Sequence, residues 1–166
     1  MSRELRMVPA NWEHPKDEKG HLIPLFGGSF KKRAAEWDEE AAQWEKGFYR
    51  LSGDEWKPKG FDKTGTYEEW NGSRSKEHDY MPDWPEAERT HYQMYESTSE
   101  GTPISPVMET PEALARWLAD NNASAFAGMG ATYEQWLATI KRGWAVSAVS
   151  SPRTGLVSGV EGLCEK

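Results

Sequence analysis

Imidazole and carboxylate groups are the side chains in this chain that could hold a metal ion or move a proton. The four histidines are His14, His21, His78 and His91. Glu13 and Asp79 lie beside two of them, and a zinc site from such ligands is conceivable. No HExxH sequence or other close histidine pair is present. The sequence therefore favours surface or hydrogen-bonded histidines, and it predicts no metal site and no cofactor.

The sequence motifs of covalent catalysis and of phosphate binding are also missing. The chain contains no GxSxG, Walker A, GxGxxG or CxxC sequence. Its one cysteine, Cys164, has no histidine near it in sequence that would activate the thiol. Carboxylate pairs such as Glu39-Glu40 carry no sign of burial. We predict no catalytic residue, although an unrecognised metal-dependent enzyme stays an alternative.

Nine tryptophans in 166 residues form the most distinctive feature of the composition. Trp12, Trp56, Trp70 and Trp84 lie in proline- and glycine-rich segments where no periodic pattern calls for burial. Because tryptophan is enriched at binding hot spots, these four and His14 are the predicted partner-binding residues. The others fall at spacings that suit a hydrophobic core: Trp37, Trp44, Trp117, Trp136 and Trp144.

A heptad pattern predicts a helix over about residues 30–47, with Ser29 as its N-cap and Gly47 near its end. The apolar positions recur at steps of four and three: Phe30, Ala34, Trp37, Ala41, Trp44 and Phe48. One interpretation is a helix that faces the protein's own core. The alternative is self-association through Phe30, Trp37, Trp44 and Phe48.

Two further helices have clear start signals. Thr110 and Pro111 mark a helix over about 111–121, and a capping box of Thr132 with Gln135 marks one over about 132–142. Gly143 is a natural end for the second of these helices. Thr90–Tyr95 has the alternation of a strand, with Tyr92 and Met94 on one face.

The order of these elements predicts an α+β fold. Trp144–Ser150 and Leu156–Val160 are β-rich and predict a C-terminal hairpin, beside other short antiparallel strands. Helices and strands do not alternate strictly, which argues against a parallel sheet. Length predicts a single compact domain over residues 1–166, with an irregular charged and aromatic segment over 50–90 and a more core-like part over 101–166.

Net charge and hydropathy limit the classes of partner and the cellular compartment that fit this sequence. A formal charge of −7 argues against direct nucleic-acid binding, which needs a basic face. No apolar run approaches the length of a membrane span, and the N-terminus lacks the apolar core of a signal peptide. We expect a cytoplasmic protein that makes no membrane contact.

Four strings together resemble a family of uncharacterised proteins from tailed bacteriophages and prophages. They are VPANWEHP at 8–15, ISPV at 104–107, YEQWL at 133–137 and VSGVE at 157–161. The resemblance implies that a phage or prophage encodes the protein, and hence that it is located in the cytoplasm of the host cell. It implies no activity and no site residues. With the abundant tryptophan and acidic charge, it favours a small non-enzymatic protein that binds another protein, such as a host enzyme or a host-defence component. A virion or assembly component that self-associates through the 30–48 helix is the alternative.

Overall fold

The chain folds into two compact units of helices and antiparallel strands, which confirms the predicted α+β class. The computed structural model describes residues 2–51, 55–97, 101–151 and 155–162. The sheet unit combines residues 1–27 with 84–166, and the inserted unit consists of residues 28–83. The single domain over residues 1–166 stays a prediction.

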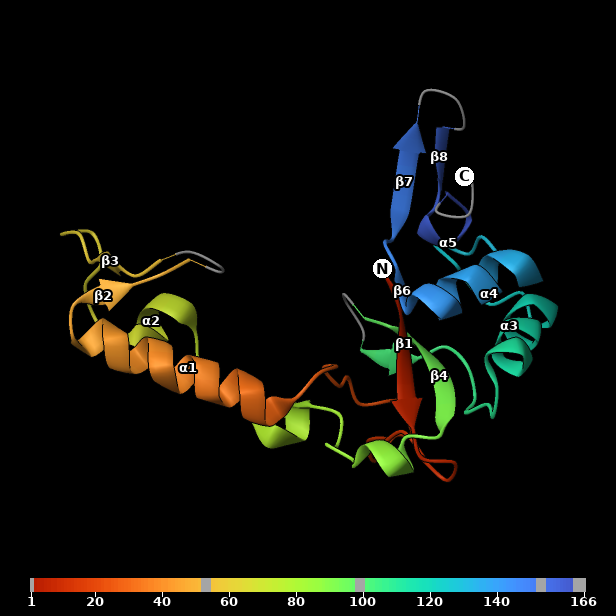
Figure 1. Ribbon diagram of the computed structural model, residues 1–166, viewed down its shortest axis with the longest axis horizontal. Coiled ribbons are helices and arrows are strands. Elements are labelled where there is room, and N and C mark those ends of the chain that lie inside the picture. The colour runs from red at the N-terminus through yellow and green to blue at the C-terminus, as the bar shows by residue number, and fades with distance from the viewer. Residues whose placement is uncertain (1, 52–54, 98–100, 152–154, 163–166) are drawn as a thin grey trace. The chain divides into compact units, whose positions relative to one another are not determined.

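The sheet unit is built on a four-stranded antiparallel sheet in the order β5-β4-β1-β6 (Figure 1). The long central pair is β1 (Arg3–Val8) and β4 (His91–Glu96), in a register that runs from Arg3 opposite Glu96 to Val8 opposite His91. The two short outer strands are β5 (Thr102–Pro103) and β6 (Trp144–Ala145). A short 3₁₀ helix, η2 (Glu86–Glu88), precedes β4. Pro9 follows β1 directly, as expected for a residue that cannot donate to a strand ladder.

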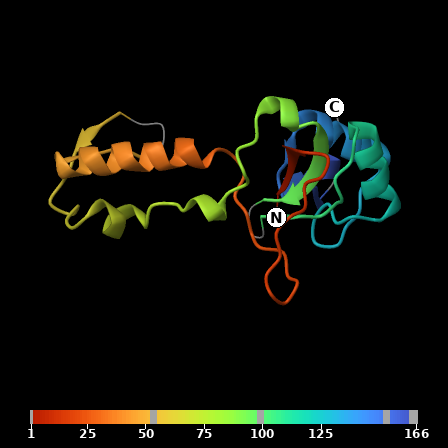
Figure 2. The same ribbon diagram turned by 90° about the horizontal axis from the view of Figure 1, so that it is seen from below.

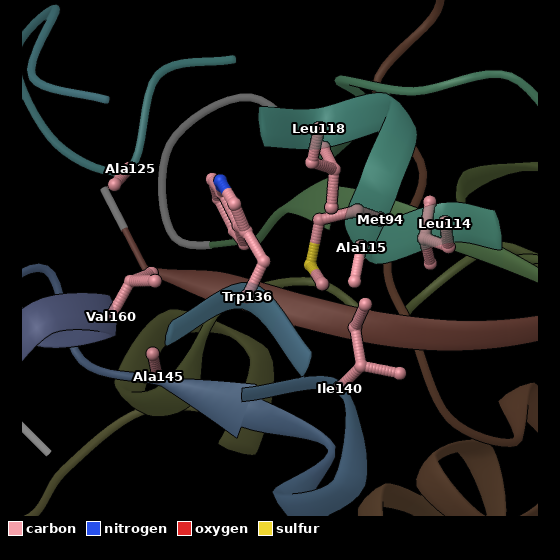
Figure 3. Close-up of a cluster of buried hydrophobic side chains, with 9 residues drawn as sticks. All are labelled: Met94, Leu114, Ala115, Leu118, Ala125, Trp136, Ile140, Ala145 and Val160. Atoms are coloured by element: carbon pink, nitrogen blue, oxygen red, sulfur yellow. The ribbon is translucent and has the colours of Figure 1, made fainter. Parts of the chain in front are cut away.

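Helices α3 (Pro111–Asp120) and α4 (Tyr133–Arg142) pack together and enclose the main core with the sheet. Met94 of β4 and Trp136 of α4 are fully buried in it (Figure 3). Trp117 of α3 is partly buried and packs against this core. The predicted alternation of β4 is confirmed, because Tyr92 and Met94 contribute to this core whereas Gln93 and Tyr95 lie on the other face. The prediction of a buried Trp144 is wrong: its side chain is 51% exposed, because it pairs with Glu4 on the face of the sheet opposite the main core, whereas its neighbour Ala145 lies in that core.

The capping signals account for the bounds of both helices. Thr110 Oγ1 accepts a hydrogen bond from the Ala113 N–H, with Pro111 as the first helical residue. The capping box of Thr132 and Gln135 begins α4, and Gly143 ends it with a left-handed φ of 91°.

The predicted C-terminal hairpin is also present, but its first strand begins at Ala148 rather than Trp144, and its second ends at Ser158 rather than Val160. It consists of β7 (Ala148–Ser151) and β8 (Gly155–Ser158), which form a separate two-stranded sheet, followed by the single-turn helix α5 (Gly159–Gly162).

The inserted unit is organised around helix α1 (Phe30–Glu45), capped by Ser29 as predicted. The short helix α2 (Tyr67–Asn71) lies alongside it (Figures 1 and 2). Strands β2 (Phe48–Tyr49) and β3 (Lys57–Pro58) form a two-residue ladder, and η1 (Glu77–Asp79) is a 3₁₀ turn. Trp44 is the centre of this unit, with 1% of its surface exposed and its Nε1–H donated to the carbonyl oxygen of Gly65 at 2.8 Å.

Candidate binding surfaces

A pocket of about 390 Å³ lies between α1 and α2 of the inserted unit, and we call it the Trp70 pocket. Leu51 and Trp70 form its apolar walls, although Leu51 is 59% exposed and Trp70 is 44% exposed. The other lining residues are polar or charged: Arg33, Glu36, Glu40, Arg50, Tyr67 and Asn71. The lining is therefore mainly polar, with two exposed apolar side chains that a partner could contact.

The Trp70 ring is held in place by the helix that carries it and by its neighbours. A capping box between Thr66 and Glu69 fixes the start of α2, one turn before Trp70. The ring stacks on that of Trp44, with centroids 5.4 Å apart and planes inclined by 27°. Lys63 Nζ lies 5.0 Å from the ring centroid. Trp70 is therefore an ordered aromatic side chain at the mouth of a pocket.

The polar side of the Trp70 pocket is a closed network. The Tyr67 hydroxyl donates to Glu40, whose carboxylate also accepts from Arg50 Nε at 3.2 Å. Burial, together with the adjacent Glu40 carboxylate, raises the pKa of the Tyr67 hydroxyl, so it stays protonated. These groups satisfy one another, and the described residues that line the pocket include no serine, cysteine or histidine. The hydroxyl of Tyr67 and the guanidinium of Arg50 are therefore both engaged by Glu40.

Trp56, another predicted partner-binding residue, connects to the same network. It is half-buried beneath the Arg50 guanidinium, whose carbon lies 4.4 Å from the ring centroid. Phe61 is fully exposed in the same unit. The sequence did not single out Phe61, although an aromatic residue between Gly60 and Asp62 without periodic apolar neighbours was a usable signal.

The remaining predicted partner-binding residues, Trp12, His14 and Trp84, belong to the sheet unit. Trp12 and Trp84 are half-buried and meet edge to face, with ring centroids 4.7 Å apart. Trp12 Nε1–H donates to the Tyr95 hydroxyl at 3.1 Å. These rings cover the face of the sheet opposite α3 and α4, which gives them a structural role.

His14 lies on this face as well, and it is buried. Its Nε2 lies 2.7 Å from the carbonyl oxygen of Ile23, and its Nδ1 lies 3.2 Å from the Tyr95 hydroxyl. Burial lowers the pKa of His14, and the Arg6 charge lowers it further despite the bond to Ile23. With Gln93, the imidazole lines an open pocket of about 580 Å³ whose other lining residues are Glu13, Pro15, Lys16, Leu22 and Pro103.

The other histidines lie apart, each with a local contact. His21 lies 3.2 Å from Asp17, His78 lies 3.3 Å from Asp79, and His91 Nδ1 lies 2.9 Å from Thr90 Oγ1. Among residues 2–51, 55–97, 101–151 and 155–162, no three His, Cys, Asp or Glu side chains are placed to share a metal ion. Cys164 lies outside the described residues.

The four predicted self-association residues have different environments. Trp44 is enclosed within the inserted unit, which makes it a core residue there. Trp37 is half-buried against Tyr67, with centroids 5.3 Å apart, and donates its Nε1–H to the Gly72 carbonyl. Phe30 is half-buried beside Tyr80, and Phe48 is exposed.

Comparison with known proteins yields no relative: no protein-family model, curated protein or solved structure matches the chain. Among the helices that the structure describes, none has the length and apolar character needed to traverse a bilayer.

Proposed function

We propose that this chain is a small non-enzymatic protein, encoded by a phage or prophage, that binds another protein through the Trp70 pocket. The observation that carries the proposal is the ordered, exposed ring of Trp70 beside the exposed Leu51. A partner inserts an apolar side chain between these two walls. Because the Trp70 ring is already fixed by Trp44, little side-chain entropy is lost on binding.

Trp56 extends the proposed contact, because it lies beneath Arg50 of the pocket lining, and Phe61 is a further exposed aromatic side chain of the same unit. Exposed apolar side chains beyond the needs of the fold often mark interaction sites, and aromatic anchors contribute most of the binding energy there. The polar groups around the Trp70 pocket are paired with one another, so a partner of balanced charge fits it better than a strongly charged one. The resemblance to phage and prophage proteins supports a host enzyme or host-defence component as the partner, in the host cytoplasm.

Affinity capture from a bacterial host lysate, with quantitative mass spectrometry of the retained proteins, tests this proposal. Leu51→Ser and Phe61→Ser remove exposed side chains and leave the stack of Trp70 on Trp44 intact. We expect either substitution to lower retention of a specific partner about tenfold or more, equivalent to about 1.4 kcal/mol.

Leu22→Ser is the matched control, because it removes an exposed leucine from the sheet unit. Circular dichroism of each variant shows that the fold persists. Retention of no protein above background would overturn the proposal. So would a partner whose retention is the same for wild type, L51S and F61S.

A further inference from the structure

The β7–β8 hairpin has two open edges. Ala148 pairs with Ser158 and Ser151 with Gly155, and among the described residues neither strand has a second neighbour. The outward N–H and C=O groups of such strands form a template for another strand. An isolated two-stranded sheet is also only marginally stable in water, so a third strand would stabilise it.

Helix α5 covers one face of this hairpin. The opposite face is exposed at Ser150 and Leu156, whereas Ser158, at the end of that face next to α5, is buried. Gly162 of α5 packs against Val149 and Val157, and it comes so close to Val149 that a Cβ on the glycine would overlap that side chain. On the opposite face, Ser150 and Leu156 lie directly across from each other, and both are exposed. Leu156 is 64% exposed and is the one large apolar side chain on that face within the described strands.

The composition of the hairpin identifies the strand that fits its edge. Natural edge strands are usually protected by lysine, proline or a bulge, but 148–151 and 155–158 contain neither a charged residue nor a proline. In an antiparallel pair related by a two-fold axis, an edge meets its own copy, so any charge on it would face a like charge. The strands of this hairpin carry no charged side chain, so the edge of one copy can pair with the same edge of a second copy without repulsion.

We propose that two copies of this chain associate by pairing β8 with β8 of the second copy, which gives a continuous four-stranded antiparallel sheet. The β8 edge is favoured over the β7 edge because Leu156 lies on β8. A two-fold axis perpendicular to the sheet places both Leu156 side chains on the same face, where they pack together. The interface is small, so the dimer is weak and depends on concentration.

Analytical ultracentrifugation of the full chain over a wide concentration range tests this pairing. We expect the wild-type mass to rise towards twice the 18.9 kDa of one chain. Leu156→Lys and Leu156→Glu should each stay at the mass of one chain, because each places like charges together. An equimolar mixture of the two variants should dimerise again. Leu22→Lys, which alters an exposed leucine elsewhere in the same unit, should behave as wild type.

Hydrogen exchange measured on the wild type provides a readout without substitution. The amides of 155–158 should exchange more slowly at high protein concentration than at low concentration. A wild-type mass that stays at 18.9 kDa at the highest concentration would overturn the pairing. So would dimerisation of L156K and L156E equal to that of wild type, or exchange at 155–158 that does not change with concentration. None of these outcomes bears on the Trp70 pocket.

Discussion

The Nδ1 atom of His14 lies 3.2 Å from the hydroxyl oxygen of Tyr95, at a position where a hydrogen bond needs a hydrogen from one of the two groups. Nε2 faces the carbonyl oxygen of Ile23, which only accepts, so Nε2 carries the hydrogen of the neutral imidazole. Nδ1 is then an acceptor. The Tyr95 hydroxyl, however, already donates its hydrogen to Gln93 Oε1, at a distance of 3.0 Å. Neutral His14 and Gln93 therefore compete for one phenolic hydrogen.

Acidification should destabilise the protein through His14. Burial lowers its pKa below the ordinary value of 6.5, so below that pH the unfolded chain binds the proton while the folded protein still excludes it. The unfolded state holds more protons there, and the free energy of unfolding falls as the pH drops below 6.5. Urea denaturation at pH about 7.5 and about 5.5 measures this effect. His14→Gln, which does not ionise, should show a smaller loss; an equal loss in both proteins would contradict the role of His14.

Removing the Tyr95 hydroxyl should cost more than a single hydrogen bond. In Tyr95→Phe, the Trp12 indole N–H loses its acceptor, and whichever of His14 Nδ1 and Gln93 Oε1 accepts the phenolic hydrogen loses its donor. Each buried group left without a partner costs about 1–3 kcal/mol, and we expect a total loss of about 2–4 kcal/mol by urea denaturation. Tyr92→Phe, on the other face of the same strand, is the control. A loss in Y95F no larger than in Y92F would show that the network does not stabilise the fold.

The same substitution at two threonines of the α4 region should have opposite effects. Thr139 is fully buried, and its Oγ1 has no hydrogen-bond partner among the described residues. Thr139→Val keeps the shape and removes the unpaired hydroxyl, so we expect thermal stability to be unchanged or higher by about 1 kcal/mol. Thr132→Val removes the N-cap that accepts from the Gln135 N–H, and should cost about 1 kcal/mol. Equal losses in both variants would contradict this account.

Gly101 should tolerate no side chain. Its φ is +60°, and a Cβ on this residue would lie 2.7 Å from the carbonyl oxygen of Leu25. The two backbones are held together, because the Leu25 N–H donates to the Gly101 carbonyl. We expect Gly101→Ala to lower the free energy of unfolding by about 2–4 kcal/mol, from backbone strain and steric overlap. Gly20 has a φ of +84° and open space around it, so Gly20→Ala should lower the free energy of unfolding only by the backbone strain, about 1–2 kcal/mol. If a denaturant titration shows the same loss of free energy of unfolding for G20A and G101A, the close approach of Leu25 does not explain the loss in G101A.

Local signals predicted the parts of the fold that depend on neighbouring residues. Caps such as Ser29 and Thr132, the stop at Gly143 and the alternation of Thr90–Tyr95 all act within a few positions, and the structure confirms each. The predicted helix over 30–47 ends two residues earlier, at Glu45.

Features that depend on distant residues could not be predicted in this way. The place of β1 in the middle of the sheet requires partners from residues 91–96 and 144–145, which no local pattern of Arg3–Val8 reveals. The predicted burial of Trp144 is wrong for the same reason, since the pairing of β6 with Glu4 and Arg3 decides that Ala145, and not Trp144, faces the core. The Trp70 pocket also depends on tertiary contact, because Glu40 of α1 meets Tyr67 of α2 only once the two helices lie side by side.

The central position of β1 has a consequence for synthesis on the ribosome. Among the strands of this sheet, β1 emerges first, but β4 and β6, on either side of it, are encoded much later in the chain. The sheet cannot close until Ala145 has left the exit tunnel, and pairings of such high contact order form slowly. The inserted unit has all its elements within residues 28–83 and can fold while the sheet is still incomplete. We therefore expect the segment made second to be the first to reach its native structure.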